Sequence, residues 1–377
     1  MAGTASPITP SVLSWALLED GRSLLDIASA AKVSPDQLAA WTKGETQPTV
    51  GQATALAKAL NRPRAFFFLP QPPVDSALPT GFRHPPGGGD RTVGSRALVE
   101  ARRAKRVQQA IASAAAGEDD LDIPAASTST NPATAAKAAR EWLKAPAPGS
   151  FKNDYDALHY WRAALENRGV LVFALQLGAD EVRGFAGWDA KAPMIVMNVS
   201  SVSPAARCFT IWHELGHLLL REATACLEPA GKLAIDNDTE RWCEAFAAAG
   251  LMPQDLVLQW LEEVGVDAGE GGIETVRRMM RWFGVSGRAA AIRLEGLGYA
   301  EPGLYGSVQA LFKPKPQGNS SKGFSPPRHK KRILEYGENA LTTILDSLPE
   351  SDALSVLRIT VADARSIAAE VPGVRSF

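Results

Sequence analysis

The stretch IWHELGHLLL, residues 211–220, decides the fold. It contains H-E-x-x-H, in which His213 and His217 stand at positions i and i+4. On a helix these positions lie on one face, so both imidazoles can reach a single metal ion. Glu214 lies about 100° further round the helix, where it misses the ion's coordination shell but can reach a water molecule bound to the ion. The pattern predicts a metal site, with zinc as the expected ion and Glu214 as the expected general base.

The residues that flank this motif predict one helix with a buried face. Ser203 can cap its N-terminus, and Pro204 suits the first helical position. An apolar stripe on the side away from the histidines consists of Cys208, Trp212, Leu215 and Leu219. We expect the opposite side to present both histidines to a cleft, with Gly216 leaving room for a neighbouring backbone. The alternative is a chance match, in which both histidines are ordinary core or surface residues; the helical context and the available third ligands favour the metal site.

The composition is that of an ordinary globular protein with no general affinity for nucleic acid or membranes. The 377 residues suffice for two or three domains, and the formal net charge is −1. No apolar run approaches the length of a membrane span, and the N-terminus lacks the features of a secretory signal. Cys208, Cys226 and Cys243 are odd in number and form no C-x-x-C motif. We therefore expect reduced thiols, a cytoplasmic protein and no membrane partner.

Residues 8–69 predict an all-α helix-turn-helix domain. Short helices are expected at about 12–19, 24–31 and 35–43, the last ending at Gly44, and another begins near Thr49. Helix, short turn, helix is a DNA-binding pattern, and the run from residue 27 to residue 60 resembles the Cro/cI (XRE) family. That resemblance implies that the helix after the turn enters the major groove of double-stranded DNA, with Gln37, Thr42 and Lys43 as the polar side chains facing it.

Two features of this domain leave a second interpretation open. Leu24 stands where the family often has a glutamine that contacts phosphate, and the expected reading helix carries Asp36. The acidic and basic residues of the domain nearly cancel, although DNA affinity depends largely on phosphate contacts. The domain can therefore also be a packing module that binds protein or supports the rest of the chain.

The remainder of the chain divides at segments rich in proline and glycine. We expect a linker at 70–93, a helical connector at 94–150, a zincin-like metallopeptidase core at 151–255, a helical subdomain at 256–310, a second linker at 311–331 and two small helices within 332–377. The phenylalanines at 66–68 are expected to dock on the next domain. Residues 102–106 are expected to form a solvated basic face, and residues 1–10 and 117–131 to be mobile.

Short β-rich runs at 170–175, 181–188 and 194–198 predict a small sheet ahead of the motif helix. The fold class is therefore α+β and mostly helical: a helix-turn-helix domain, then a zincin-like domain with a small sheet and a helical C-terminal region. The edge strand of such a sheet can pair with an extended peptide substrate. Residues 183–187 are the expected edge.

A third metal ligand is expected from a later helix. A catalytic zinc takes three protein ligands and leaves one position open for water. The next helix after the motif starts at about Asp238, and its Glu240 and Glu244 face the same way as residues i and i+4. Cys243 lies off that face. On spacing alone, either carboxylate can complete the site.

Three runs of the sequence resemble the ImmA/IrrE family of zinc endopeptidases: FTIWHELGH at 209–217, ERWCEAFA at 240–247 and LMP at 251–253. In that family an H-E-x-x-H helix is followed by E-x-x-A-N-x-F-A and L-M-P, and many members begin with an XRE domain. The family's glutamate falls on Glu240, while its Ala and Asn positions are Cys243 and Glu244 here. The resemblance implies Zn²⁺ held by His213, His217 and Glu240, with Glu214 as the catalytic base. Glu244 stays open as an alternative ligand or as an acid that supports one.

The leading hypothesis is a cytoplasmic, zinc-dependent endopeptidase that regulates transcription. The resemblance implies hydrolysis at a limited site in a partner protein, such as an XRE-type repressor. A second hypothesis is a DNA-binding regulator whose zincin domain senses a ligand or partner with little or no proteolysis. A third is a control protein that acts by binding alone. An intact Glu214 favours the enzyme, because a purely structural zinc site needs no general base.

Overall fold

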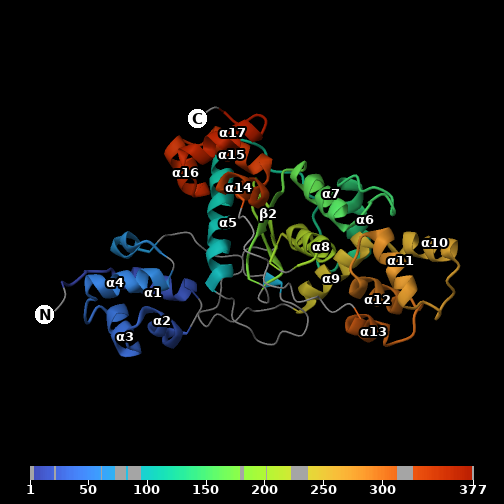
Figure 1. Ribbon diagram of the computed structural model, residues 1–377, viewed down its shortest axis with the longest axis horizontal. Coiled ribbons are helices and arrows are strands. Elements are labelled where there is room, and N and C mark those ends of the chain that lie inside the picture. The colour runs from blue at the N-terminus through green and yellow to red at the C-terminus, as the bar shows by residue number, and fades with distance from the viewer. Residues whose placement is uncertain are drawn as a thin grey trace.

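A computed structural model of the chain describes residues 4–20, 23–60, 62–72, 82–83, 95–178, 182–200, 202–221, 237–311 and 326–375. These residues form the expected fold, which is α+β and mostly helical: a helical N-terminal domain precedes a larger body built around a small sheet (Figure 1). None of the helices in this described part has the length and apolar character of a membrane span.

The N-terminal domain consists of α1 (Pro10–Asp20), α2 (Leu24–Ala31), α3 (Pro35–Lys43), α4 (Val50–Ala59) and the 3₁₀ helix η1 (Arg64–Phe68). Local sequence sets these boundaries. Ser34 and Thr49 form capping boxes with Gln37 and Gln52, and Gly44 ends α3 in the left-handed region with φ of 75°. The helices enclose a hydrophobic core of their own.

Two expectations for this domain are wrong. The phenylalanines at 66–68 do not dock on another domain as a group, since Phe67 is fully buried in the domain's own core and Phe66 packs edge-on against it. Residues 4–9 are not a free tail, because the Ser6 N–H donates to the carbonyl of Pro48 and Ile8 is buried. Both segments therefore complete the core of the N-terminal domain.

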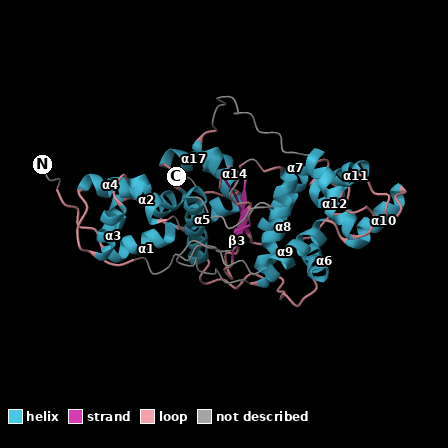
Figure 2. Cartoon of the chain, turned by 90° about the horizontal axis from the view of Figure 1, so that it is seen from below, coloured by secondary structure: helices cyan, strands magenta, loops and turns pink. Residues whose placement is uncertain are grey.

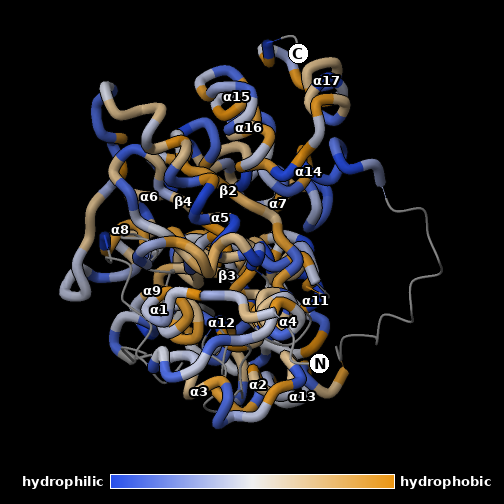
Figure 3. The backbone as a smooth tube through the Cα atoms, turned by 90° about the vertical axis from the view of Figure 1, so that its left-hand side faces the viewer, coloured by the Kyte–Doolittle hydropathy of each residue, from blue (hydrophilic) through white to orange (hydrophobic). Residues whose placement is uncertain are grey.

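Four strands form the sheet of the body: β1 (Phe82–Arg83), β2 (Leu171–Leu175), β3 (Gly184–Gly187) and β4 (Met194–Asn198). Their order is β1-β3-β4-β2, with β2 and β4 parallel and the other pairs antiparallel. Alternate residues of a strand point to opposite faces, and both faces of this sheet are buried. Val172 and Ile195 belong to the core beneath α8 (Pro204–Leu220), whereas Phe173 and Val196 belong to the core on the other face. Hydrophobic segments accordingly gather around β3 at the centre of the molecule (Figure 3).

The helices of the body lie on the two faces of this sheet. One layer consists of α6 (Pro132–Trp142), α7 (Asp154–Glu166), α8 and α9 (Asn237–Leu251), and it is extended outward by α10 (Gln254–Val264), α11 (Ile273–Phe283), α12 (Gly287–Gly296) and α13 (Leu304–Leu311) (Figure 2). The other layer consists of α5 (Ser95–Ala114), α14 (Arg328–Tyr336), α15 (Glu338–Ser347), α16 (Glu350–Leu357) and α17 (Val361–Glu370). The C-terminal segment thus contains four helices rather than the two expected.

The basic residues of α5 are not a uniformly solvated face. Arg103 is 4% exposed, and its guanidinium pairs with Glu335 at 2.9 Å and with Glu100 at 3.1 Å. Arg332 also pairs with Glu335. This buried ion cluster joins α5 to α14, although Arg103 and Glu335 are 232 residues apart in the chain.

The segment 117–131 packs against the body instead of forming the expected mobile loop. The Leu121 N–H donates to the carbonyl of Ala190, and the Ala126 N–H donates to the carbonyl of Leu219 at the end of α8. Ile123 is buried in the same core as α8. The segment is mostly polar, so its composition predicts a mobile loop, but the contacts of these few residues fix its conformation.

Candidate metal centre

The H-E-x-x-H motif lies in α8, and the local sequence sets both ends of this helix. The Ser203 side chain accepts a hydrogen bond from the Ala206 N–H, Pro204 occupies the first turn, and Arg221 ends the helix in the left-handed region. The apolar stripe packs into the core as expected. However, residues 210–219 are all buried. Both histidine side chains are therefore shielded from solvent in this structure, whereas the sequence predicts that they face a cleft.

Three side chains converge at α8: His213 and His217 from the motif and Glu240 from the first turn of α9. The two Nε2 atoms are 3.3 Å apart. The Glu240 carboxylate spans them, with Oε2 3.2 Å from His213 Nε2 and Oε1 3.4 Å from His217 Nε2. Within the described residues, they form the one group of His, Cys, Asp and Glu side chains placed to hold a metal ion. Direct packing of α9 on α8 brings the three together.

The spacing of these side chains fits a zinc ion. Ligands at about 2.0–2.2 Å from a tetrahedral zinc lie roughly 3.4 Å from one another. The separations in the site are 3.2, 3.3 and 3.4 Å. Two imidazoles and one carboxylate are also a ligand set that catalytic zinc sites use, with a fourth position left for water. The residues present therefore suit the ion that the motif predicts.

The two histidines also control the ionisation of Glu240. Burial raises the pKa of this carboxyl group, but hydrogen bonds with His213 and His217, together with their charge, outweigh burial and hold the pKa well below its usual value. Glu240 is therefore a carboxylate at neutral pH, which is the form that binds a metal ion.

Glu214 is completely buried beside the converging side chains. Its carboxylate lies close to β3, since a Cβ placed on Gly184 would be 3.4 Å from Glu214 Oε1 and only 2.5 Å from Cγ2 of Thr210. A side chain at position 184 would thus collide with α8. Sequence reasoning did not assign Gly184 a role, although a glycine inside a strand often marks such a close approach.

Only one of the two acidic candidates on α9 enters the cluster. Glu244 is exposed and lies outside the group formed by His213, His217 and Glu240. Cys243, which the sequence places off the ligand face, is buried. Burial raises the pKa of this thiol to about 11. Because Cys243 is at position i+3 from Glu240, helical spacing alone could have predicted that the two are neighbours.

The outer edge of β3 is paired rather than free. Phe82 lies opposite Phe185, and Arg83 lies opposite Gly184, in an antiparallel arrangement. The expectation that residues 183–187 form the edge of the sheet is therefore wrong. The reason is that β1, from the connection after the N-terminal domain, adds to that side. β1 is consequently next to Gly184, the residue that packs close to Glu214.

The three residues expected to face DNA lie at or near the surface of α3 and make local contacts. Gln37 Oε1 accepts a hydrogen bond from the Ser34 N–H in the capping box, and Thr42 Oγ1 donates to the carbonyl of Ala39. Lys43 is exposed, and its Nζ lies 3.8 Å from Glu45. Gln37 therefore completes the cap at the start of α3, and the Thr42 bond is internal to the same helix.

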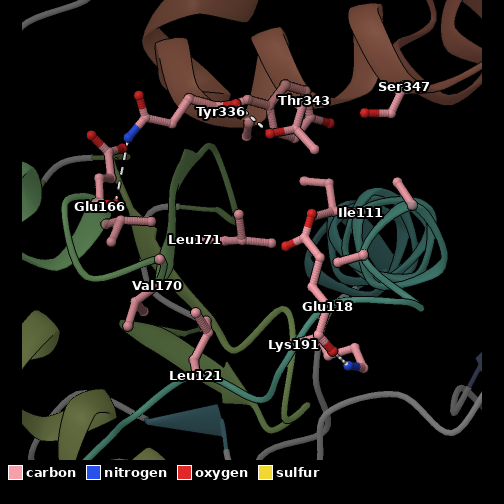
Figure 4. Close-up of a pocket in the computed structure, with 16 residues that line it drawn as sticks. Ile111, Glu118, Leu121, Glu166, Val170, Leu171, Lys191, Tyr336, Thr343 and Ser347 are labelled. Carbon is pink, nitrogen blue, oxygen red and sulfur yellow. Dashed lines mark hydrogen bonds between the residues drawn. The ribbon is translucent and has the colours of Figure 1, made fainter.

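A cavity of about 280 Å³ lies beside the outer strand β2, between the end of α5 and α15. Its lining is mixed: Ile111 and Leu171 are apolar, whereas Glu118, Lys191 and Thr343 are polar (Figure 4). Neither Glu214 nor any of the three converging side chains lines it. This cavity is therefore separate from the candidate metal centre.

Comparison with protein families matches two segments of the chain. A model described as an IrrE N-terminal-like domain, of the peptidase M78 type, matches residues 165–295, which include α8 and α9. A helix-turn-helix model matches residues 13–67. No curated protein matches the chain. The order of the two matches gives this chain the ImmA/IrrE architecture, a helix-turn-helix domain followed by a metallopeptidase-like domain.

Proposed function

We propose that this protein is a zinc-dependent endopeptidase that regulates transcription by limited cleavage of a partner protein. The observation that carries the proposal is the convergence of three side chains: the Nε2 atoms of His213 and His217 are 3.3 Å apart, and each lies 3.2 or 3.4 Å from an oxygen of the Glu240 carboxylate, as ligands of one zinc ion would. Glu214 follows His213 on the same helix, as a general base requires. The match to an IrrE N-terminal-like domain supports the same assignment.

The chemistry divides between the ion and Glu214. A bound zinc ion would polarise the scissile carbonyl and lower the pKa of the attacking water towards about 7. Glu214 accepts the proton of that water as its oxygen joins the carbonyl carbon, and then delivers the proton to the amine as the C–N bond breaks. The complete burial of Glu214 keeps bulk water from competing for this proton. The two histidines and Glu240 hold the reacting groups in place.

The substrate proposed is a protein that presents an extended segment, for example an XRE-type repressor. β1 occupies the outer edge of β3 beside Glu214, so an extended substrate segment that displaced β1 from Gly184 would pass the catalytic base. The N-terminal helix-turn-helix domain supports a role near DNA, where such repressors act. Its contribution is either double-stranded DNA binding through Gln37, Thr42 and Lys43 or docking of the substrate protein.

The test is co-expression of the chain with XRE-type repressors from the same genome. The wild-type chain is expected to produce discrete repressor fragments, whereas Glu214→Gln should bind about one zinc per chain and cleave at least 10²-fold more slowly, as loss of a general base predicts. His213→Ala should lose both zinc and cleavage. Equal cleavage by the wild type and Glu214→Gln would contradict the mechanism.

A second candidate is a DNA-binding regulator in which the metallopeptidase-like domain acts as a sensor. The cavity beside β2 supports it, because a small ligand there would contact α5 and the C-terminal helix α15 at once. DNA binding that responds to a ligand equally in the wild type and in Glu214→Gln would favour this candidate over the peptidase.

A further inference from the structure

We infer that the cavity beside β2 is a binding site for a small organic cation with an apolar body, such as a primary amine. This inference goes beyond the proposed peptidase function, since none of the residues of the candidate metal centre lines the cavity. It also deepens the sensor candidate, because it names the chemistry of the ligand. The cavity lies where the end of α5, the strand β2 and the helix α15 meet (Figure 4).

The carboxylate of Glu118 supplies a negative charge that has no partner in the described part of the chain. Its side chain points into the cavity between Ile111 and Leu171 (Figure 4). The nearby amine of Lys191 is engaged elsewhere, because its Nζ donates to the backbone carbonyl of Glu118 and lies 3.6 Å from the carboxylate of Asp120. The charge of Glu118 is therefore available to a ligand.

The other charged side chains of the lining are neutralised by their neighbours. Glu166 Oε1 accepts a hydrogen bond from Arg162 Nε at 2.8 Å. Lys191, the one basic residue among the described residues of the lining, pairs with Asp120. Each of these pairs sums to zero, which leaves the single negative charge of Glu118. A cation is attracted to this charge, whereas an anion is repelled by it.

The helix ends at the cavity reinforce the preference for a cation. A helix carries a partial negative charge at its C-terminus, where the last carbonyl groups lack partners within the helix. Both α5 and α7 end in residues that line the cavity, Ala114 and Glu166 respectively. α14 ends at Tyr336 and α15 begins at Glu338, so their opposite partial charges offset each other. Two negative helix ends therefore act in the same direction as Glu118.

The rest of the lining provides apolar walls and two hydroxyl groups. Ile111 on α5, Leu171 on β2 and Ala340 on α15 supply apolar surface from three sides. Thr343 and Ser347 line the cavity from α15, and a hydroxyl oxygen can accept a hydrogen bond from an ammonium group. The site therefore suits a ligand whose apolar body carries one charged, hydrogen-bonding end.

The volume limits this ligand to a small molecule. The cavity of about 280 Å³ is close to the lower limit for ligand pockets, which is about 300 Å³. A cavity of about 150 Å³ already binds benzene, so this one has room for an aromatic ring with a short arm that ends in an ammonium group. Phenethylamine matches this description. Phenethyl alcohol and phenylacetate are probes of nearly the same size, with a neutral and a negative end.

The experiment is a ligand-observed NMR titration of the full-length chain with these three probes. Phenethylamine is expected to bind most tightly, phenethyl alcohol about 5-fold more weakly and phenylacetate more weakly still, because an ion pair exposed to water changes an affinity by up to about 5-fold. Glu118→Gln should raise the Kd of phenethylamine by about the same factor and leave the Kd of phenethyl alcohol within about 2-fold of the wild type. Glu262→Gln, at an exposed glutamate on α10, is the matched control and should change neither Kd.

A second variant tests whether the cavity, rather than the surface around Glu118, holds the ligand. Ala114 lines the cavity but is exposed, so Ala114→Phe can fill the space without disturbing the buried core. It should abolish saturable binding of both phenethylamine and phenethyl alcohol. The inference is overturned by equal affinities for the three probes, by the absence of phenethylamine binding to the wild type, or by phenethylamine binding that either Glu118→Gln or Ala114→Phe leaves unchanged. None of these outcomes involves zinc or cleavage, so this inference and the proposed peptidase function can fail separately.

Discussion

The choice between Glu240 and Glu244 as the third ligand leads to the most discriminating prediction. The two residues share one helix and one residue type, but only Glu240 lies within 3.4 Å of both histidine Nε2 atoms, and Glu244 is exposed. We expect Glu240→Ala to weaken zinc binding strongly and Glu244→Ala to leave it unchanged. The second variant thus controls for loss of a carboxylate from α9.

The magnitude follows from the number of ligands. Structural zinc sites with four protein ligands bind with about 10–16 kcal/mol, which is about 2.5–4 kcal/mol per ligand. Because about 1.4 kcal/mol corresponds to a tenfold change in an equilibrium constant, removal of Glu240 should raise the zinc Kd by about 10²- to 10³-fold. The carboxylate is also the only one of the three ligands that carries a negative charge, so its contribution to the binding free energy should lie at the upper end of this range.

Thermal unfolding with and without zinc provides the assay, because a ligand that binds only the folded state stabilises it. At a zinc concentration of 100 times the wild-type Kd, the stabilisation is about 2.7 kcal/mol. At the same concentration, Glu240→Ala should gain less than about 1 kcal/mol, whereas Glu244→Ala should match the wild type. Zinc-dependent stabilisation that survives in Glu240→Ala and disappears in Glu244→Ala would refute the assignment.

Three further predictions concern other parts of the molecule. Phe82→Pro and Arg83→Pro each remove one N–H from β1. The variant whose lost N–H faces β3 should weaken the β1–β3 pairing by about one hydrogen bond and raise the initial rate of peptide cleavage about 2- to 10-fold. Equal cleavage rates in the two variants would show that β1 does not compete with substrate. Glu335→Ala removes the carboxylate that Arg103 and Arg332 share, and should lower the free energy of unfolding in urea by about 3–5 kcal/mol. Glu274→Ala removes one member of an exposed ion pair and should lower it by at most about 1 kcal/mol. Gln37→Ala breaks a capping box and should destabilise the N-terminal domain by about 1 kcal/mol, and a gel-shift assay of the same variant tests its expected contact with DNA.

Helix boundaries were the most predictable part of the fold, because capping is a local effect. Ser23, Ser34, Ser203 and Thr49 each begin a helix through a side-chain hydrogen bond to a backbone N–H, and Gly44 ends one. Each decision depends on residues only a few positions apart, so the sequence contains the information. The same holds for the i, i+4 spacing of His213 and His217.

Segments whose conformation depends on distant partners were predicted poorly. The local sequence around Arg103 predicts a solvated basic face, but in the fold Arg103 forms a buried ion pair with Glu335, which is distant in the chain. Phe67 looks like an exposed anchor, but the helices of its own domain enclose it. Residues 183–187 look like a free edge because two-residue pairings such as β1 leave no periodic signal in the sequence.

The sequence by itself determined the chemistry available to this protein: two imidazoles one helical turn apart, a carboxylate beside them and a helix-turn-helix module ahead of them. These features follow from spacing along single helices, which the 3.6-residue turn converts directly into geometry. Only the tertiary structure decided that Glu240 rather than Glu244 joins the two histidines, and that β3 approaches Glu214 closely at Gly184. Each of these depends on how two elements pack across a shared core, and side-chain volumes throughout that core set the packing, so no single stretch of sequence specifies it.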